Sequence, residues 1–143
     1  MKIFIFVLFC VLIAVYDVKT FRIPDVFLVL FAAAMAAAAL AEGNGHNLLA
    51  ARRFMAAAFS FVLFGFVWCY TQGMGFGDVK YASVLGFFLG LENLVTACLI
   101  SSCLAFCVYI LGIYVSRIPK TARIPFAPFL SAGAIFAAGG GAA

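Results

Sequence analysis

Apolar runs alternate with short polar breaks along the whole chain. The runs cover residues 1–16, 26–41, 54–70, 79–91, 94–116 and 125–143. Most are shorter than the ~20 residues that a helix needs to cross a hydrocarbon core of ~30 Å, so tilt or local thinning must make up the difference. The stretch 81–116 is too long for one crossing and suits two. We therefore expect a short fourth helix that stops at Glu92 and Asn93.

The apolar runs are predicted to be helices rather than strands. They lack the alternation of apolar and polar positions that a membrane barrel requires. Inside hydrocarbon a helix satisfies its backbone groups within the segment, and the many Ala and Gly residues let helices approach closely. The expected fold class is all-α: a polytopic membrane protein with about six transmembrane helices, built as one domain over residues 1–143.

Composition agrees with a membrane protein and excludes several other classes. Apolar residues make up 68% of the chain and charged residues 10%, a balance that a water-soluble domain of this size cannot bury. The net charge of +4 comes from cations scattered at the edges of apolar runs, so we expect a lipid bilayer and no nucleic acid as partner. Five cysteines lie in apolar segments without a CxxC pair, and the single histidine has no nearby ligand partner. No metal or other cofactor is therefore expected.

The cations divide unevenly between alternate loops, which predicts the orientation of the chain. One side carries Lys19, Arg22, Lys80, Arg117, Lys120 and Arg123, and the other carries Lys2, Arg52 and Arg53. Because cytoplasmic loops hold the excess of Lys and Arg, the first side should face the cytoplasm. Asp17, Asp25 and Asp78 then lie at the cytoplasmic face, while Glu42 and Glu92 lie opposite.

Two of these acids, Asp17 and Asp78, are the candidate catalytic residues. Asp17 closes the first apolar run and Asp78 opens the fourth, so both carboxyl groups are expected at the same depth of the membrane edge. Two carboxyls that share one proton can hydrolyse a peptide bond without metal: one takes a proton from water and the other hydrogen-bonds the scissile carbonyl. On helix-dipole grounds we expect Asp78, near a helix N-terminus, to be the base.

The sequence "GMGFGDVK", residues 73–80, surrounds Asp78 with small residues. Gly73, Gly75 and Gly77 can adopt positive φ and allow close approach of another backbone, such as an extended substrate. Glycine-rich turns between membrane helices are common, so the pattern alone also fits a plain turn. Lys80 is expected either to support this loop or to anchor the helix at the membrane edge.

Asp25 is the rival of Asp17, because both lie near the first loop. It follows Pro24 where the second helix is expected to begin, a position that suits an N-terminal cap satisfying free N–H groups. We therefore expect Asp25 to be structural. In the same way, Pro125 and Pro128 are expected to start the last helix.

Three segments together resemble one known family. "YDVKTFRIPD" (16–25), "GMGFGDVK" (73–80) and "RIPFAPFL" (123–130) are similar, in order and spacing, to the landmarks of the type IV prepilin peptidases. The resemblance covers nearly the whole chain. It implies a membrane aspartic endopeptidase of the bacterial inner membrane that faces the cytoplasm and cuts the basic leader from prepilins or pseudopilins. The two aspartates of that family fall on Asp17 and Asp78, and its loop includes Gly75, Gly77 and Lys80.

Longer members of that family also methylate the new N-terminus and carry a cytoplasmic insertion with paired CxxC motifs. Neither the insertion nor the motifs occur in this sequence, so the resemblance is to the short, peptidase-only form. Two other functions remain open. Acidic residues at a membrane are used by transporters and proton channels, although here the helix interiors hold almost none. "YD" at 16–17 and "GFGD" at 75–78 also resemble presenilin-like intramembrane proteases.

Overall fold

The structure, a computed structural model, describes residues 2–41, 47–71, 75–116 and 125–140. The described residues form α1 (Lys2–Thr20), α2 (Asp25–Ala41), α3 (Asn47–Thr71), α4 (Phe76–Ser116) and α5 (Ala127–Gly140). Three segments are long and apolar enough to cross a membrane: Lys2–Thr20, Ala51–Tyr70 and Phe76–Gly112. Asp25–Ala37 and Ala127–Gly140 are shorter apolar helices. The all-α membrane fold predicted from the sequence is confirmed.

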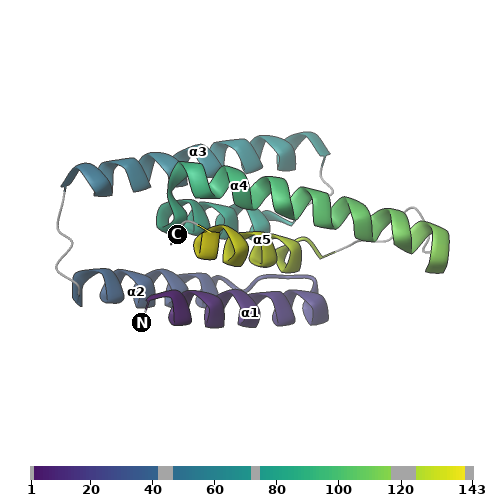
Figure 1. Cartoon of the computed structure of the whole chain (residues 1–143), viewed down its shortest axis with the longest axis horizontal. Helices are drawn as coiled ribbons and strands as arrows, with labels where there is room; N and C mark the ends of the chain where they lie inside the picture. The colour runs from purple at the N-terminus through teal and green to yellow at the C-terminus, as the bar shows by residue number, and fades with distance from the viewer. Residues whose placement is uncertain (1, 42–46, 72–74, 117–124, 141–143) are drawn as a thin grey trace.

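Helix α4 consists of two helical arms joined at a break, as the sequence predicted for this stretch. Gly90 has φ 74 and ψ 173, a non-helical conformation inside the element. Figure 1 shows α4 running in one direction up to this point and then turning back. The break lies at Gly90, two residues before the predicted stop at Glu92 and Asn93, and both of those residues continue the second arm as helix. Glycine takes a positive φ without steric cost, which suits Gly90 to the break.

The helices form a bundle in which α5 lies between α1 and α4 (Figure 1). α3 packs on α4, and α2 packs on α1 and on α4. By contrast, no Cα atom of α1 lies within 8 Å of a Cα atom of α4. Helix α5 thus fills the space between the two elements that carry the candidate aspartates.

An aromatic cluster joins three of the helices in the core. The ring of Phe31 on α2 lies 5.7 Å from that of Phe6 and 5.2 Å from that of Phe9, both on α1. It also lies 5.9 Å from the ring of Phe88 on α4. Large apolar side chains elsewhere on the described surface are exposed, which is the pattern of a bundle surrounded by lipid rather than water.

Helix α5 packs tightly on the second arm of α4 because Gly133 has no side chain. A methyl group at this position would collide with the carbonyl oxygen of Ala97 and the hydroxyl of Ser101. Small residues at such contacts allow the van der Waals packing that holds membrane helices together. This contact fixes the position of α5, whose first residue lies beside Asp17.

Candidate active site

Asp17 lies on the buried face of α1. The buried residues Phe6, Cys10, Ile13 and Asp17 recur at intervals of three or four, so they form one stripe along the helix. Only 5% of Asp17 is exposed. Its Oδ2 accepts the backbone N–H of Ala127, the first residue of α5, at 3.3 Å. The carboxyl group therefore satisfies a free donor at the start of a neighbouring helix.

Helix α1 ends less than one turn after Asp17, at Thr20. Phe21 has φ 52, and its N–H donates to the carbonyl oxygen of Asp17 at 2.8 Å. This is the left-handed cap that many helices use, here formed by a residue other than glycine. Helix α1 thus runs to Thr20, past the predicted boundary at residue 16, and Asp17 belongs to its last turn.

Asp78 lies in the first turn of α4 and is also buried, with 7% exposed. Its backbone N–H donates to the carbonyl oxygen of Gly75 at 3.0 Å, which shapes the turn that enters the helix. Oδ1 of Asp78 is buried and has no hydrogen-bond partner among the described residues. A buried carboxyl oxygen without a partner is costly, and such groups in native proteins often belong to functional sites.

Asp17 and Asp78 lie at the same end of the bundle. Figure 1 shows the end of α1 and the starts of α4 and α5 together at one side of the molecule. The two carboxyl groups are near enough for the charge of Asp17 to act on Asp78. Their Cα atoms are more than 8 Å apart, since no closer pair exists between α1 and α4. The two backbones are therefore not in contact, and any contact between the carboxyl groups requires the side chains to extend toward each other.

The structure adds a second helix N-terminus to the helix-dipole argument for Asp78 as the base, which stays a prediction. Asp78 does lie at the N-terminus of α4, as expected. Asp17, however, lies not only in the last turn of α1 but also at the N-terminus of α5, through its bond to Ala127. Both carboxyl groups therefore face the positive end of a helix, and the dipole no longer separates their roles.

Of the glycines before Asp78, Gly77 is closely packed, and neither Gly75 nor Gly77 has an unusual dihedral angle. Among the described residues, Gly90 is the glycine with positive φ, so neither Gly75 nor Gly77 uses the conformation predicted for them. A Cβ on Gly77 would lie 3.0 Å from Cβ of Ile23 and 3.4 Å from its backbone nitrogen. Gly77 therefore admits the chain's own loop between α1 and α2. Gly73 lies outside the described residues.

Lys80 and Asp25 join the first loop to α4. Nζ of Lys80 lies 2.8 Å from both carboxyl oxygens of Asp25. The Lys80 ammonium also lies 5.3 Å from the centre of the Phe76 ring. Asp25 begins α2 as predicted, but its described hydrogen bonds go to Lys80 instead of to free N–H groups of α2. With 67% of its side chain exposed, Asp25 differs sharply from the buried Asp17.

A buried hydrogen bond joins α4 to α5 near the aspartates. The hydroxyl groups of Tyr81 and Ser131 lie 2.8 Å apart, joining α4 to α5 one turn beyond Asp78. Sequence reasoning missed both this bond and the bond from Ala127 to Asp17. The prolines correctly indicated the start of α5, but nothing in the local sequence shows which carboxyl group that start will face.

Within the described chain, no three side chains of His, Cys, Asp or Glu lie together as a metal site would require.

Comparison with known proteins places these residues in context. A model of the type IV leader peptidase family matches residues 4–111. The chain is 29% identical over 134 residues to the "Prepilin leader peptidase/N-methyltransferase" of Bacillus subtilis (strain 168). That alignment covers 93% of this chain and 53% of the relative, so the chain spans about half the length of the relative. No solved structure matches.

Proposed function

This chain belongs to the type IV leader peptidase family, and we propose that it is a membrane aspartic endopeptidase that cleaves the leader from prepilins or pilin-like subunits. The family match covers Asp17, Asp78 and Lys80, and it confirms the family resemblance; the first two of the three sequence segments lie within it. The name of the Bacillus subtilis relative supports the same substrate class. The catalytic residues, the orientation and the exact reaction of this chain are our proposal.

The observation that carries the proposal is a pair of buried carboxyl groups, from two different helices, at one end of a membrane bundle. Buried acids are rare in membrane helices and mark functional sites by default. Of the aspartates at this end, Asp25 is exposed and paired with Lys80. Asp17 and Asp78 are therefore the residues to which we assign catalysis.

In the proposed reaction the two aspartates share one proton. Asp17 is ionised and acts as the base, because the N–H of Ala127 stabilises a carboxylate. Asp78 holds the proton, since its unpartnered buried oxygen is less costly in a neutral carboxyl group. This assignment reverses the one expected from helix dipoles alone.

Water attacks the scissile carbonyl carbon while Asp17 takes one of its protons and Asp78 donates its own to the carbonyl oxygen. A tetrahedral intermediate results, with Asp17 now protonated and Asp78 ionised. Asp17 then protonates the leaving nitrogen as the C–N bond breaks, and Asp78 recovers a proton from a hydroxyl of the intermediate. The products are a carboxylic acid and a free amine, and both aspartates return to their starting states.

Three contacts are proposed to hold the pair in register. Gly77 admits the backbone of Ile23, and Lys80 binds Asp25, so the first loop is held against the start of α4. In the third contact, the backbone N–H of Ala127 holds the carboxyl group of Asp17. Gly75 and Lys80 are thus assigned to support of the active-site loop, and the reacting atoms contact only the two aspartates.

The active site is proposed to face the cytoplasm of a bacterial inner membrane. The cations near this end, which include Lys19, Arg22 and Lys80, follow the excess found in cytoplasmic loops. A basic leader would then reach the aspartates from the cytoplasm while the pilin helix stays in the bilayer. We propose peptidase activity without methyl transfer, because the sequence contains no CxxC pair.

Incubation of the purified chain in lipid vesicles with a prepilin peptide tests the proposal. The expected result is one cut at the end of the leader, seen by mass spectrometry. The same vesicles loaded with a pH-sensitive dye distinguish the alternative of a proton channel: proton flux without cleavage would favour it. Cleavage without flux supports the peptidase.

A further inference from the structure

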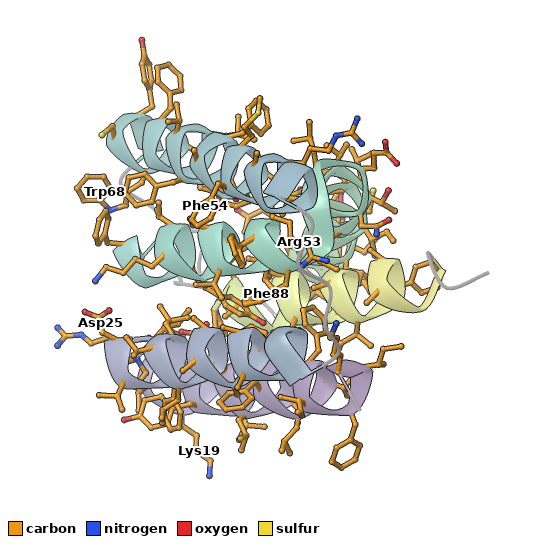
Figure 2. The ribbon with its side chains drawn as sticks, turned by 90° about the vertical axis from the view of Figure 1, so that its left-hand side faces the viewer. Lys19, Asp25, Arg53, Phe54, Trp68 and Phe88 are labelled. Atoms are coloured by element: carbon orange, nitrogen blue, oxygen red, sulfur yellow. The ribbon has the colours of Figure 1, made fainter. Side chains whose placement is uncertain are left out.

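A second polar site lies at the opposite end of the bundle from the two aspartates. A cavity of about 710 Å³ opens there between the first turns of α3 and the break in α4. Its polar residues are Arg52, Arg53, Glu92 and Asn93. Figure 2 shows Arg53 near Phe88, which also lines the cavity, whereas Asp25 lies at the far end of the molecule.

The two guanidinium groups of this cavity are available for a ligand. Neither Arg52 nor Arg53 forms an ion pair or hydrogen bond with another residue of the described chain. Arginine presents a planar fork of donors that matches a phosphate group. Glu92, on the opposite wall, supplies one carboxylate, so the lining carries a net positive charge that suits a singly charged anion.

The remaining walls of the cavity are apolar. Met55 and Phe59 come from α3, and Phe88, Leu89 and Leu91 come from the two sides of the break in α4. The break itself forms part of the lining, because Gly90 has nothing within 4 Å of the position that a Cβ would take. A cavity with cations at a helix end and apolar walls along the helix matches an amphiphile better than a small soluble anion.

We propose that this cavity binds the headgroup of an anionic phospholipid with free hydroxyl groups, of which phosphatidylglycerol is the test case. The phosphate lies between Arg52 and Arg53, the glycerol hydroxyls donate to Glu92 and Asn93, and the first part of an acyl chain follows Phe59 and Phe88. The cavity lies where membrane-crossing helices end, which is the depth of a lipid headgroup. The site is independent of the proposed peptidase activity.

Lipid binding to the full chain tests this proposal. The protein is reconstituted in nanodiscs of phosphatidylcholine with increasing phosphatidylglycerol, and bound lipid is counted by native mass spectrometry after release into detergent. The wild-type chain should retain phosphatidylglycerol over phosphatidylcholine at least tenfold. The double variant Arg52→Gln/Arg53→Gln should lose that preference, while the control Lys19→Gln/Arg22→Gln, which removes two exposed cations from the other end, should keep it.

Two further results would overturn the proposal. Equal retention of phosphatidylglycerol by the wild-type chain and the Arg52→Gln/Arg53→Gln variant would show that the cavity does not select the lipid. Inorganic phosphate at millimolar concentration that displaces the lipid and raises the Tm equally would show a soluble-anion site. If the double variant does not fold, Glu92→Lys provides the second test: it removes the acceptor of the glycerol hydroxyls and should weaken the selectivity for phosphatidylglycerol over the monomethyl ester of phosphatidic acid, which carries the same single charge but has no glycerol hydroxyls.

Discussion

Oδ2 of Asp17 on α1 accepts the backbone N–H of Ala127 on α5 at 3.3 Å, across 110 positions of the chain. The contact joins the first and last helices at the end of the bundle that also holds Asp78. It gives Asp17 a structural partner in addition to its proposed chemical role. Experiments on this residue must therefore distinguish loss of the helix contact from loss of catalysis.

Replacing Ala127 by proline removes the donor to Asp17 and leaves the helix start intact, because proline is tolerated at the first helical position. A hydrogen bond to a charged group contributes about 1.5–3 kcal/mol, so we expect kcat to fall roughly 10- to 100-fold. Peptide cleavage by the purified variant measures this. Ala127→Val adds similar volume but keeps the N–H, so equal activity of the two variants would contradict a role for the bond.

The ion pair between Lys80 and Asp25 should matter far less than the buried acids. Both side chains are partly or largely exposed, and such pairs contribute about 0–1 kcal/mol. We expect Asp25→Asn and Lys80→Met each to retain activity within about tenfold of the wild type. The exchange Asp25→Lys/Lys80→Asp should recover part of the loss. Abolished cleavage in Asp25→Asn would instead indicate that Asp25 is one of the catalytic acids.

Alanine at Gly77 should disturb the site more than alanine at Gly75. A methyl on Gly77 meets Ile23 at 3.0 Å and pushes the first loop away from α4, whereas one on Gly75 meets Oδ2 of Asp78 at an ordinary 3.5 Å. Overpacking of this kind costs about 1–3 kcal/mol. We expect a lower Tm and reduced cleavage for Gly77→Ala. The second change Ile23→Gly, which removes the opposing Cβ, should restore part of the activity; no rescue would argue against this contact.

Gly133→Ala tests the packing that positions α5. The added methyl collides with the Ala97 carbonyl and the Ser101 hydroxyl, so the helix must move away from α4. We expect destabilisation of about 3 kcal/mol or more, seen as a lower Tm in detergent. Gly139→Ala, on the same helix with open space around it, is the matched control and should keep the wild-type Tm. Similar Tm values for both variants would contradict the close contact.

The sequence predicted the helices and the end of the bundle where the aspartates lie, because apolar length and cation placement are local properties. It placed the break of α4 two residues late, since Glu92 and Asn93 are polar yet remain helical while Gly90 takes the positive φ. The error shows that a polar pair at a membrane edge is a weaker sign of a turn than a glycine.

The contacts between helices could not be predicted from the sequence. Asp25 was correctly placed at the start of α2, but its bond to Lys80 depends on how α2 and α4 pack. The same holds for Ala127 and Asp17, whose pairing is the reason that we propose Asp17 rather than Asp78 as the base. Residue type and spacing indicate which side chains lie at the end of a helix. The packing of the helices determines which residues of the other helices those side chains contact.

The central claim is that Asp17 and Asp78 act together on one peptide bond. Cleavage of a prepilin peptide by Asp17→Asn, Asp78→Asn and the double variant, each in lipid vesicles, tests it most directly. Asparagine keeps an oxygen that can accept the N–H of Ala127, so the fold should persist, as circular dichroism and Tm will show. We predict that each single change lowers kcat by roughly 10³-fold or more and that the double change is no worse, because both residues serve the same step. A folded single variant that cleaves within tenfold of the wild-type rate would contradict the claim.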